Sequence, residues 1–162
     1  VQQNNRNDIK KRNIIQWAPI TYKKGRLVAV ARTNGKEVAR HQLETTGPAV
    51  ALKLELENTD WKADGMDLQY VKVYAVDSKG RKVPTAAGQV AFDVQGAAKL
   101  IAVDNGDHTS DELFAGNTRA LHQGFALGIL RATETSGTVT IKASVKGLKG
   151  AQRTMITKNT AQ

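Results

Sequence analysis

Residues 138–146 read TVTIKASVK, a stretch in which apolar and polar side chains alternate without interruption. Successive side chains of a β-strand point to opposite faces of its sheet, so the pattern divides this stretch into two faces. One face carries Val139, Ile141, Ala143 and Val145, and the other carries Thr140, Lys142, Ser144 and Lys146. The pattern predicts a strand that is buried on one face and solvated on the other.

The same two-residue period recurs along the chain. Residues 49–57 (AVALKLELE) alternate leucines with charged residues, and residues 68–77 (LQYVKVYAVD) are apolar on both faces, as in a central strand. Further strand-like runs cover residues 26–32, 36–44, 89–94, 99–103, 125–132 and 152–158. Runs that recur about every 8–12 residues with turns between them favour a β-sandwich over alternating strands and helices. We expect an all-β, antiparallel fold without a helix.

Turn signals suggest how the strands are grouped. Thr33-Asn34-Gly35 separates two runs, and Asn-Gly predicts a hairpin because both residues tolerate positive φ. Turn residues at 58–60 and 63–65 interrupt the pattern again, so we place a domain boundary after residue 57. We expect part of a β-sandwich over residues 1–57, a β-sandwich over 58–150, and a last strand with a tail over 151–162.

The composition limits the partners. The net charge is +9, but most cations, such as Lys53 and Lys72, stand singly between apolar neighbours, and no aromatic residues are spaced to stack bases. No run approaches the ~18 apolar residues that span a bilayer. We therefore expect neither a nucleic-acid nor a membrane partner. The chain has no cysteine, which excludes disulfides and is compatible with the bacterial periplasmic or secreted location that we expect.

Polar and acidic side chains are concentrated in residues 102–116 (AVDNGDHTSDELFAG), which contain four acids in a chain that is otherwise basic. The oxygens do not have the spacing of an EF-hand loop, so we expect no metal and no cofactor. Asp111 and Glu112 are adjacent in a polar loop that would neither hold them apart nor raise one pKa, so they do not form a catalytic pair. We interpret Asp104, Asn105, Gly106 and Asp107 as a structural turn with Gly106 at positive φ.

Two tryptophans are candidates for carbohydrate binding, because exposed indole rings can stack on sugars. Trp17 and Trp61 are the only tryptophans of the chain, and aromatic residues make up 5% of it. With so few aromatic residues the core must contain some of them. The alternative for Trp61 is packing between domains.

Several segments, in order and spacing, resemble the C-terminal immunoglobulin-like domain of bacterial glycoside hydrolase family 2 enzymes of the β-galactosidase type. The segments are residues 67–77, Gly80 with Val83-Pro84, residues 90–96, residues 100–107 (LIAVDNGD) with Phe114, and residues 124–131 (GFALGILR). Upstream, Trp17 followed by residues 22–27 (YKKGRL) and the Asn-Gly hairpin is similar to the preceding sandwich domain of these enzymes.

The resemblance implies an immunoglobulin-like sandwich that is the tail of a larger hydrolase, cut inside its penultimate domain. Family members carry their catalytic glutamates in a (β/α)8 barrel that this chain lacks, so no residue here is expected to be catalytic. The remainder of the parent chain is the expected partner. The chain would brace the barrel or shape access to a glycan, and its open sheet edge could pair with a second copy.

Two alternatives stay open at this point. The chain could be a carbohydrate-binding module that uses Trp17 or Trp61, or an immunoglobulin-like spacer of a bacterial surface adhesin. A fold likeness alone does not separate them, because sandwiches host many functions.

Overall fold

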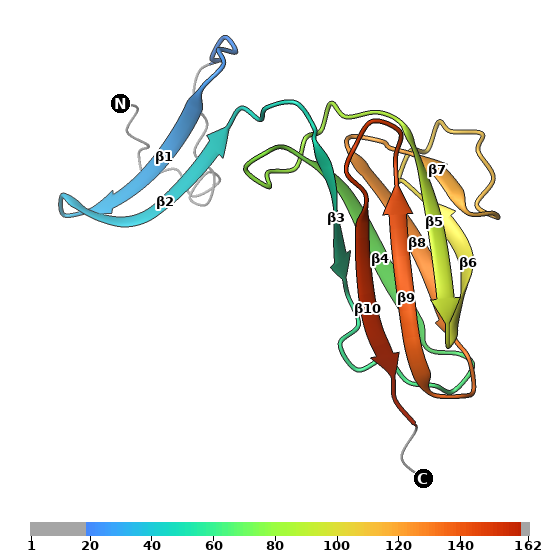
Figure 1. Cartoon of the computed structure of the whole chain (residues 1–162). Helices are drawn as coiled ribbons and strands as arrows, with labels where there is room; N and C mark the ends of the chain where they lie inside the picture. Colours follow the sequence, from blue (N-terminus) through green and yellow to red (C-terminus); the bar gives the residue numbers. More distant parts are fainter. Residues whose placement is uncertain (1–18, 160–162) are drawn as a thin grey trace. The chain divides into compact units, whose positions relative to one another are not determined.

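A computed structural model describes residues 19–159 of the 162-residue chain. It contains ten β-strands, labelled β1 to β10, and no helix over the described residues, which confirms the all-β expectation. The described part therefore holds no helix long and apolar enough to cross a membrane. The chain divides into two compact units, residues 1–45 and 46–162 (Figure 1).

The first unit contains a β-hairpin. Strand β1 (Arg26–Thr33) pairs antiparallel with β2 (Lys36–Glu44), and Thr33 lies opposite Lys36 across the turn. Asn34 and Gly35 have φ of 50° and 79°. Both turn residues thus adopt positive φ, as the Asn-Gly signal predicts for a tight hairpin.

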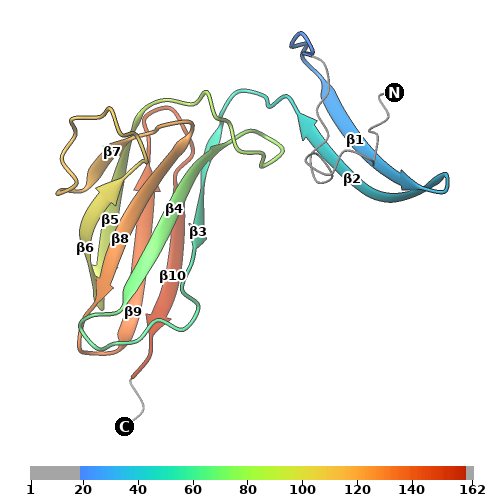
Figure 2. The same cartoon turned by 180° about the vertical axis from the view of Figure 1, so that it is seen from behind.

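The second unit is a β-sandwich of two four-stranded antiparallel sheets (Figures 1 and 2). One sheet has the order β3-β4-β8-β6, with β3 (Ala51–Leu56), β4 (Leu68–Val76), β8 (Phe125–Ala132) and β6 (Ala98–Asp104). The other has the order β10-β9-β5-β7, with β10 (Ala151–Thr157), β9 (Gly137–Ser144), β5 (Gln89–Gly96) and β7 (Thr118–Ala120).

Alternation along the strands builds the core between the two sheets. On β9, Val139 and Ile141 are fully buried while Lys142 is exposed. On the opposite sheet, β4 contributes Val71, Val73 and Ala75, which are also fully buried. The period-two pattern therefore aims the apolar side chains of both sheets at one another, and their burial drives the sheets together.

The domain boundary lies earlier than the turn signals suggested. Strand β3 pairs with β4 over its whole length, so it belongs to the sandwich rather than to the region 1–57. The last strand, β10, lies within residues 151–162 as expected and pairs with β9. The division falls between Thr45 and Thr46, which corrects the boundary expected after residue 57. The turn at residues 58–65 connects two neighbouring strands of one sheet. Leu52 and Leu54 of β3 are buried because they belong to the core cluster of the sandwich.

Candidate functional site

Trp61 lies in the interior of the sandwich. Its side chain is 2% exposed, within the same hydrophobic cluster as Val71 and Leu130. The indole Nε1 donates a hydrogen bond of 3.0 Å to the backbone oxygen of Asp67, which satisfies its one polar atom. Trp61 therefore offers no face to a sugar and serves as a core residue of this unit. Trp17 lies outside the described residues.

Residues 104–107 form a tight turn at the end of β6. The Asp104 carboxylate accepts hydrogen bonds from the backbone N–H of Asn105 (2.7 Å) and Gly106 (3.2 Å), and Asn105 Oδ1 accepts one from Asp107 N (3.0 Å). Gly106 has φ of 73°, a conformation that glycine adopts without a steric penalty. The side-chain oxygens are thus engaged by the turn's own backbone.

Arg119 of β7 is the residue of this region that the sequence patterns missed. Its side chain is 1% exposed. Nη1 donates to the backbone oxygen of Glu112 (2.8 Å), and Nη2 donates to Asn105 Oδ1 (3.0 Å) and lies 3.7 Å from Asp104 Oδ1. Nε lies 3.7 Å from Glu112 Oε2. A strand of three residues has too little periodicity to reveal which way Arg119 points. The local excess of acids was the available hint.

Glu112 is held in its ionised form. Gln89 Nε2 donates to its carboxylate at 2.7 Å, Ala120 N donates at 3.2 Å, and Arg119 adds a positive charge. These contacts, with the Gln89 hydrogen bond first, lower the pKa of Glu112. A general acid needs the opposite environment, one that raises its pKa. Glu112 is therefore a structural anchor for the loop.

Asp107 is similarly engaged, at the other end of the same loop. Thr109 donates both its hydroxyl (2.7 Å) and its backbone N–H (2.9 Å) to Asp107 Oδ1, and these hydrogen bonds lower the pKa of Asp107. His122 Nδ1 lies 3.4 Å from Asp107 Oδ2. Within residues 19–159, every carboxyl group with a resolved pKa shift is shifted downward. No group of three His, Asp or Glu side chains in that range could hold a metal ion.

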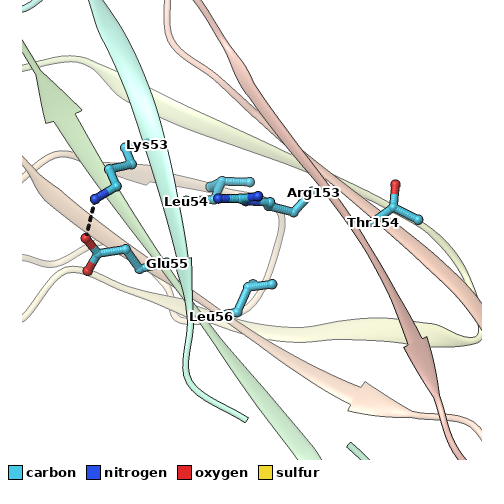
Figure 3. Close-up of a pocket in the computed structure, with 6 residues that line it drawn as sticks. All are labelled: Lys53, Leu54, Glu55, Leu56, Arg153 and Thr154. Carbon is cyan, nitrogen blue, oxygen red and sulfur yellow. Dashed lines mark hydrogen bonds and ion pairs between the residues drawn. The ribbon is translucent and has the colours of Figure 1, made fainter. Parts of the chain in front are cut away.

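A shallow groove of about 420 Å³ lies where the open edges of the two sheets run side by side (Figure 3). Isolated parallel bridges lie near both ends of strands β3 and β10: Ala51 of β3 pairs with Lys149, which precedes β10, and Lys62, which follows β3, pairs with Lys158, which follows β10. The lining residues are Lys53, Leu54, Glu55, Leu56, Arg153 and Thr154.

The groove has the wrong chemistry for catalysis. Its one carboxylate, on Glu55, is ion-paired with Lys53 at 3.1 Å, and the two leucines contribute only apolar surface (Figure 3). Glycoside hydrolysis requires two carboxyl groups that flank one bond. The groove is therefore an open seam between two sheet edges.

The comparisons with known proteins agree on one family. Residues 52–154 match the model of the glycoside hydrolase family 2 C-terminal domain 5. A β-galactosidase of Bacteroides ovatus is 32% identical over 137 residues, which cover 85% of this chain and 16% of that protein. A β-glucuronidase of Formosa agariphila is 30% identical over 148 residues, which cover 88% of this chain and 14% of that protein.

A solved structure also matches. The crystal structure of a family 2 glycosyl hydrolase from Bacteroides cellulosilyticus is similar with a TM-score of 0.86 and 35% identity, over 94% of this chain and 20% of that one. The chain thus spans about a sixth of the length of the curated relatives that it matches. The family model covers the sandwich from β3 into β10, the part that contains the core and Arg119 with its hydrogen-bond partners. The chain belongs to glycoside hydrolase family 2, in which it corresponds to C-terminal domain 5.

Proposed function

We propose that the chain is a non-catalytic accessory region of a family 2 glycoside hydrolase that cleaves β-galactosides or related β-glycosides. The proposal depends chiefly on the match of residues 52–154 to a C-terminal domain of such enzymes. Relatives named as a β-galactosidase and a β-glucuronidase indicate the reaction class, hydrolysis of an O-glycosyl bond.

The chemistry of the described residues supports an accessory role. Asp107 and Glu112, in the loop after β6, are hydrogen-bonded and have lowered pKa values, and the groove between β3 and β10 has no carboxylate pair. A retaining or inverting glycosidase needs one carboxyl group with a raised pKa beside a second, ionised one. The catalytic groups of the parent enzyme would therefore lie elsewhere, and the sandwich would brace them by packing.

The test uses the full-length product of the gene that encodes this chain. We expect it to hydrolyse an aryl β-galactoside or an aryl β-glucuronide, while the 162-residue chain alone hydrolyses neither. Removing residues 46–162 from the full-length product should lower its melting temperature and its kcat/KM. Hydrolysis by the isolated chain would contradict the accessory role, and a full-length product without glycosidase activity would contradict the parent assignment.

Location, glycan binding and self-association belong to the same proposal. We propose a bacterial periplasmic or secreted location, with which the absence of cysteine is compatible. Fractionation of the native host would test it.

Since Trp61 is buried, glycan binding through a tryptophan would rest on Trp17 alone. The open edges of the β1–β2 hairpin are the proposed site of pairing with a second copy, which sedimentation would detect.

A further inference from the structure

Two large apolar side chains project from the loop between β6 and β7. Leu113 is 77% exposed and Phe114 is 61% exposed. The loop extends from one end of the sandwich (Figures 1 and 2). Exposed apolar residues are ordinary when they stand singly, but two adjacent ones leave a larger apolar area in water.

This pair is held on a rigid base. Immediately before it, the backbone oxygen of Glu112 accepts from buried Arg119, and the Glu112 carboxylate accepts from Gln89 and Ala120 N. Phe114 itself accepts a backbone hydrogen bond of 2.8 Å from Val103 N, and its ring centroid lies 5.2 Å from the Arg119 guanidinium carbon. The fold therefore fixes the backbone on both sides of Leu113 and holds the Phe114 ring beside Arg119 while both side chains stay exposed.

Such preorganisation lowers the cost of docking, because the loop loses little conformational entropy when a partner covers it. Rigid aromatic residues backed by an ordered base are typical anchors of protein interfaces. Two side chains are nevertheless too few for an interface between separate molecules, which needs on the order of 1,000 Å². They are sufficient when the partner is tethered to the same chain, since the effective concentration then reaches the millimolar range.

The size of the relatives indicates a tethered partner. The matched curated relatives are about six times longer than the segment that this chain covers. Four acids lie in this region of a chain whose net charge is +9: Asp104 at the end of β6, and Asp107, Asp111 and Glu112 in the loop. A complementary surface would be an apolar pocket with cationic groups at its rim.

We propose that Leu113 and Phe114 seat in an apolar, cation-rimmed pocket on the remainder of the parent polypeptide and thereby dock the sandwich against it. This inference depends on the proposed function only in that a longer parent chain exists. A sugar is a poorer occupant, because the aliphatic side chain of Leu113 provides no ring for stacking beside Phe114.

The experiment compares one double variant in two settings. Leu113→Ser with Phe114→Ser is introduced into the isolated 162-residue chain and into the full-length gene product. Met66→Ser is the matched control, because Met66 is 78% exposed in the loop between β3 and β4. Calorimetry gives the melting temperature of each protein, and hydrogen exchange reports on the amides of residues 112–115.

In the isolated chain we expect the double variant to shift the melting temperature by no more than about 2 °C, since both side chains are already in water. In the full-length product it should lower the unfolding temperature of the sandwich by several degrees, while Met66→Ser does not. The amides of residues 112–115 should exchange at least about tenfold more slowly in the full-length product than in the isolated chain.

Other outcomes overturn the proposal. Equal shifts in the two settings, or equal exchange rates, would show that nothing in the parent covers the loop. Dimers of the isolated chain that the double variant dissociates would assign the surface to a second copy. Protection of these amides by galactose or glucuronic acid would assign it to a glycan. The glycosidase assay is independent of all these readouts, so loss of the proposed function and loss of the docking surface are distinguishable.

Discussion

At the scale of single residues, Arg119 shows how a buried charge can organise a loop. Its guanidinium donates hydrogen bonds to Asn105 Oδ1 and to the Glu112 backbone oxygen. It also lies near the carboxylates of Asp104 and Glu112. A buried charge is tolerated only when it is paired and hydrogen-bonded. The cluster thus connects β7 to the turn after β6 and positions the exposed pair between them.

Replacing Arg119 should destabilise the sandwich strongly. We expect Arg119→Met to lower the free energy of unfolding by about 3 kcal/mol, because Asn105 and Glu112 lose their partner inside the fold. Urea unfolding followed by tryptophan fluorescence measures this change. Arg131→Met, at an exposed position of β8, is the matched control and should change it by less than about 0.5 kcal/mol. Equal losses in the two variants would refute the structural role of Arg119.

Asp77, directly after β4, is a second charged residue that organises the chain around it. Arg81 Nε donates to its carboxylate at 2.8 Å, and the backbone N–H groups of Gly47, Lys79 and Arg81 donate as well. The Arg81 hydrogen bond, followed by these backbone contacts, holds the pKa of Asp77 well below its ordinary value of 3.8. The folded state therefore favours the ionised carboxylate more than the unfolded state does.

This difference sets a pH dependence with a definite sign. Because the folded pKa of Asp77 is depressed, its contribution to stability is complete above the ordinary pKa near 3.8 and is lost as pH falls below it. We expect Asp77→Asn to be less stable than the parent protein at pH 7 and to lose less further stability between pH 5 and pH 3. Urea midpoints across that range measure both effects. Asp93→Asn, on an exposed position of β5, controls for the loss of one negative charge, and parallel curves for Asp77→Asn and the parent would count against the assignment.

At the scale of elements, glycines decide where two strands can turn or approach. Gly96, at the end of β5, has φ of 97°, and a Cβ there would overlap the backbone oxygen of Thr138. Gly106 has a similar positive φ of 73°, but a Cβ there would meet no atom within 4 Å. The two positions therefore share a conformational requirement, and only Gly96 also has a steric one.

Alanine substitutions separate these two causes. Gly106→Ala should cost about 1 kcal/mol, the strain of a left-handed conformation with a side chain. Gly96→Ala should cost about 3 kcal/mol or more, because β5 and β9 must also move apart. Urea unfolding of both variants provides the comparison. Equal costs would mean that the close approach of Thr138 to Gly96 contributes nothing.

At the scale of the whole molecule, the two units differ in how their strands are supported. The hairpin is a two-stranded sheet whose apolar side chains Leu27, Val38 and Leu43 are more than half exposed. The sandwich instead buries strands from two sheets around one core. An isolated two-stranded hairpin is at best marginally stable in water, whereas a packed sandwich unfolds cooperatively.

Hydrogen exchange should reveal this difference in the 162-residue chain. We expect amides of β1 and β2 to exchange at least about a hundredfold faster than those of β4, β8 and β9, because local opening of the hairpin breaks few apolar contacts. Strand β3 should be protected with the sandwich, in contrast to a boundary after residue 57. Uniformly slow exchange across both units would contradict the expectation.

A shortened chain provides the matching control. Residues 46–162 retain both sheets and Trp61, so their urea transition should coincide with that of the full 162-residue chain. Because Trp17 is absent from this shorter chain, its fluorescence reports on Trp61 alone. A much weaker transition would show that the sandwich depends on the first 45 residues.

The sequence by itself determined the Asn-Gly hairpin, the family and every described strand except the three-residue β7, because period-two alternation, positive-φ turn residues and the VDNGD segment are local features that a few neighbouring residues specify. Only the tertiary structure decided that β3 joins the sandwich, that Trp61 is a core residue, and that Arg119 is buried among acids. Each of these depends on strand pairing between segments far apart in the chain. Burial and ion pairing are properties of those long-range contacts, and no local pattern encodes which contacts form.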